Sequence, residues 1–301
     1  MIKRLISTKV GVCSILAIGI CSSGAFSQTA QNGKFDSTLA VNVKKPTSID
    51  ASASKAILNS ATKKAPNSGR DFSGGYVGGY GGVNWNGSSA DTSTIFSPTG
   101  YFAVTSPDAI AIAGHKRFNK TGFTGGGTVG YNYQSDHGLL GIEADFGYVG
   151  NNQTVTASGV YPCCSPTGFT VTQTLKNRWL FTARPRIGVV YSNMLIYGTG
   201  GLAVTDLKYS ETFTDTFATA TESGAINKTK FGYTAGGGLE YLFGNSWSMK
   251  GEFLFSSFGR TTTTSTNLAA FTPPIAFPMN IFTHSIYLKE SSLRFGVNYH
   301  F

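Results

Sequence analysis

The stretch "SSLRFGVNYHF", residues 291–301, decides the fold class of this chain. Apolar or aromatic residues occupy every second position, and polar or small residues occupy the positions between them. Such alternation indicates a β-strand whose two faces meet different surroundings. The apolar set is Leu293, Phe295, Val297, Tyr299 and Phe301, and the other set is Arg294, Gly296, Asn298 and His300.

The same alternation returns along residues 72–301, where no apolar pattern of helical period extends over the length of a helix. The alternating segments predict eight strands, each about 10 to 15 residues long, which suits a tilted crossing of a bilayer. These segments are residues 76–85, 123–133, 139–149, 176–190, 194–209, 230–243, 248–257 and about 284–301.

The connections between the predicted strands alternate in length. Tight turns at 135–138, 192–193 and 244–247 contrast with long pieces at 86–122, 150–175, 210–229 and 258–283. This arrangement is typical of an outer-membrane barrel with short periplasmic turns and long extracellular loops. The sequence therefore predicts an all-β fold, an eight-stranded antiparallel transmembrane β-barrel.

A soluble β-sandwich is the alternative fold, because it also alternates but buries its apolar face. Aromatic residues near the strand ends, such as Trp179 and Tyr241, favour the membrane, where they would form interfacial girdles. The composition agrees: only 13% of residues are charged, 13% are aromatic, and the mean hydropathy is −0.03.

The N-terminal part predicts export. Residues 1–27 combine basic Lys3 and Arg4 with an apolar run at 10–20 that is too short to span a bilayer, as in a cleaved signal peptide. Residues 28–71 are expected to form a flexible periplasmic linker, and residues 72–301 the barrel in the cell outer membrane. The linker is basic, but its only aromatic residue is Phe35, so no nucleic-acid partner is expected.

Several stretches also carry a family likeness, which covers the strands of residues 74–301 but neither the long loops nor the linker. They are "GGYVGGYGGVNW", "GFTGGGTVGYNYQ", "GIEADFGY", "ARPRIGVVYSNMLIYGTGGLAV", "GYTAGGGLEYLFGNSW" and "LRFGVNYHF". In order and spacing they resemble the small porin-like outer-membrane barrels of alphaproteobacteria, the Brucella and Bartonella type of surface antigen in the opacity-type porin group. The resemblance implies an abundant surface protein that supports the envelope; some members are antigens and some resemble haemin binders.

The chain departs from that family in its long linker, in Cys163 and Cys164, and in Pro185. Pro185 lies inside a predicted strand and cannot donate a ladder hydrogen bond, so we expect a bulge or a skipped bond there. A bond between neighbouring cysteines is strained, so we expect no disulfide framework and interpret Cys163 and Cys164 as a loop feature without metal.

Charged residues on the inward faces predict how the lumen is filled. An eight-stranded barrel is only just wide enough for its own side chains, and buried charges need partners. Near balance between the signs favours a packed salt-bridge network, with a conducting or substrate-binding lumen as the alternative. The acids are Glu143, Asp145, Glu240 and Glu252, and the bases are Arg178, Arg184, Arg186, Lys250 and Arg294.

A structural surface protein is therefore the predicted function, with a narrow porin or a haemin-binding surface protein as alternatives. His115, beside Lys116 and Arg117 in the first long loop, is the weak haemin candidate. No catalytic or metal site is expected, because no Ser motif is placed with a His and an acid. The expected partners are outer-membrane lipid and lipopolysaccharide, host surface factors at the loops, and the barrel assembly machinery. The assembly signal would be Phe295, Val297, Tyr299 and Phe301.

Overall fold

The computed structural model describes residues 71–301. The expected signal peptide at 1–27 and the expected linker at 28–71, apart from Asp71, lie outside the described residues. No helix within residues 71–301 has the length and apolar character needed to cross a membrane.

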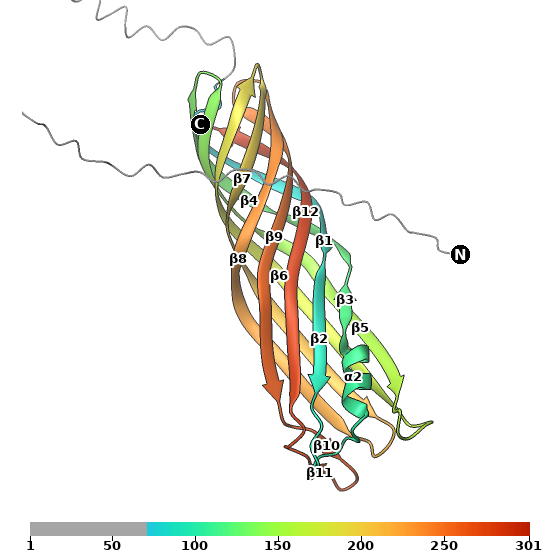
Figure 1. The fold of residues 1–301 in the computed structure, drawn as a ribbon. Coiled ribbons are helices and arrows are strands. Elements are labelled where there is room, and N and C mark those ends of the chain that lie inside the picture. The colour runs from blue at the N-terminus through green and yellow to red at the C-terminus, as the bar shows by residue number, and fades with distance from the viewer. Residues whose placement is uncertain (1–70) are drawn as a thin grey trace, which may run out of the picture. The chain divides into compact units, whose positions relative to one another are not determined.

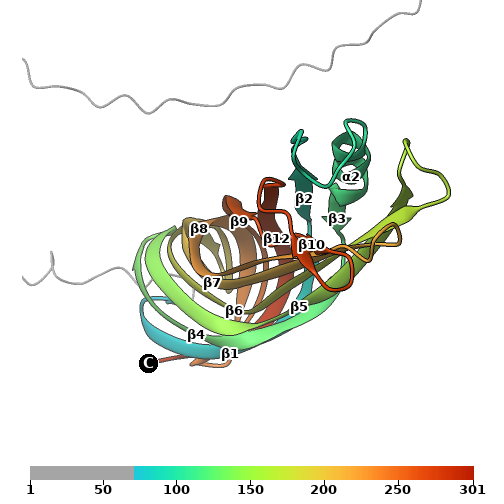
Figure 2. The same cartoon turned by 90° about the horizontal axis from the view of Figure 1, so that it is seen from below.

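Eight antiparallel strands close into a ring, which Figure 1 shows from the side and Figure 2 shows end-on. The last strand pairs with the strand before it in the ring and also with the first strand, so the ring has no open edge at its base. The predicted eight-stranded antiparallel barrel is confirmed. Its strands are β1 (Gly74–Asn86), β4 (Thr121–Ser135), β5 (Gly138–Val160), β6 (Gly168–Tyr191), β7 (Met194–Asp215), β8 (Thr221–Phe243), β9 (Trp247–Ser265) and β12 (Phe282–His300).

The tight turns lie where the sequence predicts them, between β4 and β5, β6 and β7, and β8 and β9. Each contains a residue with positive φ, which tight hairpin turns require. These residues are Asp136 at 51°, Ser192 at 57° and Gly244 at 71°.

An apolar belt surrounds the half of the barrel that carries these turns. Large apolar side chains point outward from every strand of the ring, and Ile142, Phe231 and Phe295 are 65%, 74% and 63% exposed. Exposed apolar surface on this scale is stable only where lipid covers it. Alternate residues point inward, so the belt and the lumen are the two environments that the alternation predicts.

Above the belt the strands continue, so the loops in the structure are much shorter than the sequence predicts. Strands β5 to β9 are 19 to 24 residues long, and their upper outward faces are rich in hydroxyl side chains. On β5 and β6, cross-strand hydroxyl pairs join Thr154 to Thr174 and Thr156 to Thr172. The period-two pattern persists here with threonine facing water, which is why these segments resembled Ser/Thr-rich loops in the sequence.

The expected first loop, 86–122, is also mostly ordered structure. It contains β2 (Ser88–Thr94), the helix α2 (Ser106–Gly114) and β3 (Lys116–Phe118). Strand β2 pairs with the N-terminal half of β12 and continues the wall beyond β1, while α2 lies against β2, β5 and β6. This part of the molecule, which we call upper, is drawn at the bottom of Figure 1. Pro107 in the first turn favours the start of this helix, because a missing N–H is harmless there. The short strands β10 (Ala269–Ala270) and β11 (Ile275–Ala276) form a small hairpin at the tip.

This upper, water-facing part, which we call the extension, has an interior of its own. A lower apolar layer packs between the walls, and an aromatic layer closes the tip. The lower layer includes Leu175, Leu207, Tyr209, Ile226 and Leu288. The tip layer includes Phe102, Tyr161, Phe169, Phe213 and Phe282.

Two local features test the departures noted in the sequence. Pro185 points outward from β6. Ala183 and Arg186 each pair with a residue of β7, but the two residues between them do not, and the register of the β6–β7 ladder is the same on both sides of this gap. The expectation for the cysteines was wrong in one respect, because the structure joins Cys163 to Cys164 in a disulfide within the turn between β5 and β6.

Candidate functional site

The lumen inside the apolar belt is filled by a network of charged side chains centred on Arg184. One guanidinium nitrogen of Arg184, Nη2, donates to Glu143 at 2.7 Å and to Asp145 at 2.8 Å. Its Nη1 donates to Glu252 on β9 at 3.2 Å, across the lumen. The planar fork of arginine suits this geometry, because it presents several donors in fixed directions.

Three further basic side chains complete the network. Lys250 donates to Glu143 at 2.7 Å, Arg294 to Asp145 at 2.9 Å, and Arg186 to Glu240 at 3.0 Å. The lumen positions therefore hold four acids and four bases, each in at least one ion pair, and none of the eight is more than 5% exposed. Their formal charges sum to zero, so this network carries no excess of either sign.

Tyrosines and small polar residues fill the spaces that the charges leave, and the sequence analysis did not include them. The Tyr76 hydroxyl donates to Glu143 at 2.6 Å and the Tyr197 hydroxyl to Glu252 at 3.0 Å. The Arg186 guanidinium lies 4.7 Å from the Tyr76 ring centre and 5.0 Å from that of Tyr197, as in a cation–π contact. Their places on the inward faces of β1 and β7 were the sequence signal that could have identified these tyrosines as lumen residues.

Glycines make room for the tyrosines. A Cβ at Gly130, which is opposite Tyr76 in the β1–β4 ladder, would lie 2.2 Å from the Tyr76 hydroxyl oxygen. A Cβ at Gly147 would lie 2.2 Å from the Tyr80 hydroxyl oxygen. The glycine-rich runs thus let aromatic rings lie flat across the inner wall.

Arg178 does not belong to the lumen, contrary to the expectation from strict alternation. Its side chain is 63% exposed and lies 3.9 Å from Asp206. The β6 ladder slips between Lys176 and Leu180, so one extra residue reverses which side chains point inward. The Asp206 carboxylate accepts the backbone N–H groups of Arg178 and Trp179 at 2.8 and 3.2 Å, which stabilises this bulge.

The expected assembly face and the haemin candidate both lie on exposed surfaces. The assembly residues point outward from the end of β12, with exposed fractions of 63%, 42%, 37% and 76% for Phe295, Val297, Tyr299 and Phe301. His115 follows α2, and its Nδ1 lies 2.5 Å from Asp91, which also accepts a hydrogen bond from Arg260 at 3.0 Å. One ring nitrogen of His115 is therefore already paired with a carboxylate.

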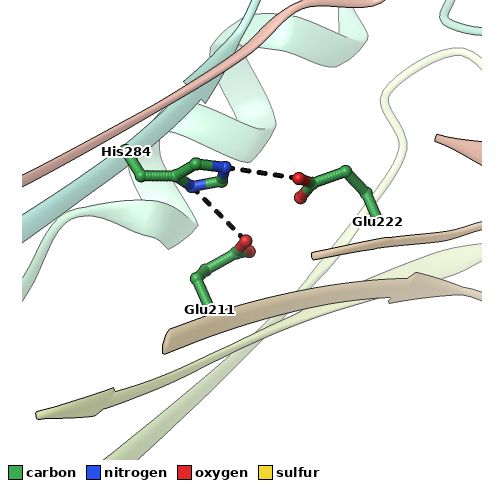
Figure 3. A group of neighbouring side chains, drawn as sticks. All are labelled: Glu211, Glu222 and His284. Carbon is green, nitrogen blue, oxygen red and sulfur yellow. Dashed lines mark hydrogen bonds and ion pairs between the residues drawn. The ribbon is translucent and has the colours of Figure 1, made fainter. Parts of the chain in front are cut away.

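A polar layer separates the two apolar layers of the extension, and Figure 3 shows its centre. His284 on β12 lies between two glutamates, with Nδ1 3.4 Å from Glu211 on β7 and Nε2 3.3 Å from Glu222 on β8. All three side chains are buried, and one donor atom from each lies within 4.8 Å of the others. Burial and the neighbouring Glu222 carboxylate raise the pKa of Glu211 to about 10. Imidazole and carboxylates are ligands of divalent transition metals, so this cluster could hold an ion, although no metal site was expected.

The same histidine also has a serine neighbour. Ser265 Oγ lies 2.9 Å from His284 Nε2, while Ser265 also donates a hydrogen bond to Glu222. The structure thus brings a serine, a histidine and an acid together, although the sequence contains no motif that places them as a nucleophile, a base and an acid. Sequence inspection missed the group because Glu211 and Ser265 lie in stretches that resembled loops, while His284 lies at the very start of its predicted strand.

Comparisons with known proteins can now be set beside this geometry. A family model described as the outer membrane protein beta-barrel domain matches residues 51–301. The 31 kDa outer-membrane immunogenic protein of Brucella melitensis is 32% identical over 187 residues, which is 62% of this chain and 72% of that protein. The 22 kDa outer membrane protein of Rhizobium leguminosarum is 31% identical over 137 residues, or 46% of this chain and 53% of that protein. The solved structure of Neisserial surface protein A aligns with 76% of this chain and 98% of its own, at 11% identity and a TM-score of 0.30.

Proposed function

Since the chain belongs to the outer membrane protein β-barrel family, as the expected resemblance implied, we propose that it is a closed surface barrel that strengthens the outer membrane. It would present its rigid extension outside the cell for contact with host molecules or ligands. In this proposal the protein is neither a pore nor an enzyme.

The observation that supports this proposal is the balanced ion-pair network in the lumen. A porin keeps a polar, water-filled channel, whereas here the eight charged groups are buried and bound to one another. Lumen side chains at this density exclude the water that ions need in order to pass. The network also joins β5, β6, β8, β9 and β12 across the interior, so it stiffens the barrel.

The geometry around Ser265 is the reason why the proposal excludes catalysis. A serine nucleophile needs a histidine base and also an approach for its substrate. His284 is 0% and Glu211 is 1% exposed, and Ser265 shares its hydrogen with Glu222, which competes for it. A fluorophosphonate probe should therefore leave the folded chain unlabelled; labelling that is lost in Ser265→Ala would show that the site is an open hydrolase.

The extension is proposed as the contact surface because its tip carries exposed apolar side chains that lie far from the belt. Ile95, Phe96 and Phe217 are 52%, 45% and 57% exposed there. Exposed apolar side chains in water are a common feature of interaction sites. At the other end, we propose that the outward face of β12 that ends at Phe301 is the surface offered to the assembly machinery.

Single-channel recording in a planar bilayer tests the closed lumen. We expect the refolded protein to give no conductance steps, while resistance to added protease and a heat-dependent shift in gel mobility show that it is inserted and folded. In Arg184→Ala, the lost side chain leaves a gap at the centre of the network, and we expect small steps to appear. Arg178→Ala is the matched control on the same strand and should stay silent. Steps from the unaltered protein would show that the lumen conducts and that the proposal is wrong.

A further inference from the structure

The polar layer of the extension contrasts with the lumen network below it. In the lumen network, each of Glu143, Asp145, Glu240 and Glu252 is paired with an arginine or a lysine. In the extension, His284 is the only basic side chain paired with Glu211 or Glu222 in the part of the chain that the structure describes. Two carboxyl groups thus share one imidazole in a site from which water is largely excluded.

Several buried oxygen atoms in this layer also lack a hydrogen-bond donor. Both carboxylate oxygens of Glu211 and the Oε2 atom of Glu222 accept no hydrogen bond, although Glu211 Oε2 lies 3.4 Å from His284 Nδ1. Gln173, which is 0% exposed, donates to Thr92 at 3.1 Å and to the Gly114 carbonyl at 2.8 Å, but its own Oε1 is unpaired. Thr92 in turn lies 3.4 Å from His284 Nδ1, which places these atoms in one layer. Unsatisfied buried acceptors are uncommon, and a bound cation is one way in which they are satisfied.

The histidine ring is held in place by the surrounding structure. A Cβ at Gly224, in the ladder opposite Glu211, would lie 2.4 Å from ring atoms of His284, so only glycine leaves room for the imidazole. The Phe282 ring lies nearly parallel to the imidazole, with an interplanar angle of 15° and ring centres 6.2 Å apart. A ring fixed by a glycine and an aromatic neighbour is preorganised, as good metal ligands are.

From these observations we infer that Glu211, Glu222 and His284 form a buried site for a divalent first-row transition ion, and that Zn²⁺ fits it. One neutral imidazole with two carboxylates balances the charge of the ion and supplies three ligands, so a fourth position remains for water or for the Gln173 oxygen. Around a tetrahedral ion the ligand atoms stand about 3.3 Å apart. The candidate ligand atoms lie within 4.8 Å of one another. Because Glu211 faces Nδ1 of His284 and Glu222 faces Nε2, one of the two carboxyl groups has to turn toward the nitrogen that the other one faces before both can bind the same ion.

Bound zinc would connect β7, β8 and β12 above the membrane. It would hold the extension together from inside, where no lysine or arginine is paired with the glutamates. This inference is separate from the closed lumen, because the two groups of residues lie in different layers and are tested by different measurements.

Zinc titration of the folded protein tests the inference. The protein in detergent is stripped with a chelator, and Zn²⁺ binding is followed by calorimetry and by metal analysis after dialysis. We expect one ion per chain, with Glu211→Gln and His284→Gln each weakening binding by about 100-fold or more, since even loss of an outer contact to a metal ligand costs 10- to 100-fold. His115→Gln is the matched control, because His115 also lies beside an acid but is exposed, and it should bind zinc as the unaltered protein does.

Three results would overturn the inference: no stoichiometric zinc in the unaltered protein, unchanged binding in both site variants, or loss of binding in His115→Gln. If the site variants do not fold, X-ray absorption of the unaltered protein loaded with Co²⁺ decides the matter. A shell of one imidazole nitrogen with oxygen ligands supports the site, and a shell of oxygen alone rejects it.

Discussion

Replacing Arg184 with methionine is the most direct test of how the lumen is stabilised. The change removes three charge-assisted hydrogen bonds but keeps an unbranched side chain that replaces the apolar stem of the arginine. Glu143 retains Lys250 at 2.7 Å, and Asp145 retains Arg294 at 2.9 Å. Within the ion pairs of residues 71–301, however, Arg184 is the only basic partner of Glu252.

The expected magnitude follows from that one orphaned carboxylate. Removing one member of a buried pair costs about 3–5 kcal/mol, because the other charge remains buried without compensation. We therefore expect Arg184→Met to lower the free energy of unfolding by that amount. The Tyr197 hydroxyl, which donates to Glu252 at 3.0 Å, offsets only part of it. The double variant with Glu252→Gln should recover part of the loss, since it removes the orphaned charge.

Urea unfolding of the barrel in lipid vesicles, followed by tryptophan fluorescence and gel mobility, measures this change. Arg178→Met is the control on the same strand, because its exposed pair with Asp206 should be worth no more than about 1 kcal/mol. Equal stability of the two variants would refute the reasoning, since it would mean that the lumen charges are not desolvated.

Two further predictions concern the wall. Phe295→Arg places a charge in the apolar belt and should destabilise the barrel by about 2–4 kcal/mol in vesicle unfolding. Thr156→Arg on the polar wall is its control and should change stability by no more than about 0.5 kcal/mol. Similar losses of stability in both variants would mean that lipid does not cover Phe295. Gly130→Val should cost about 1–3 kcal/mol because the new Cβ overlaps the Tyr76 hydroxyl, while Gly127→Val, whose Cβ would meet nothing closer than 3.8 Å, serves as its control. Equal thermal midpoints for the two glycine variants would show that Tyr76 does not lie across Gly130.

Strict alternation predicted the membrane part of the barrel well, because lipid on one side and a packed lumen on the other impose a period of two on every strand. The same rule failed at Arg178, where a bulge stabilised by Asp206 adds a residue that no single-strand pattern reveals. It also failed above the belt, where water outside allows Thr156 in place of an apolar residue and the strand resembles a loop. The cluster at His284 could not be predicted, because its members become neighbours only through the register of these upper strands.

The pairing of β1 with β12 has a consequence for how the protein enters its membrane. Tyr76 lies opposite His300, so the seam of the ring joins the two ends of the described chain. Until that seam forms, two strands have unpaired N–H and C=O groups, and hydrocarbon offers no partner for them. A half-built ring therefore cannot rest in lipid as a stable intermediate. Insertion into the membrane and closure of the ring must therefore be coupled. Strand β12 has to be in place to pair with β1 before β1 can enter the bilayer.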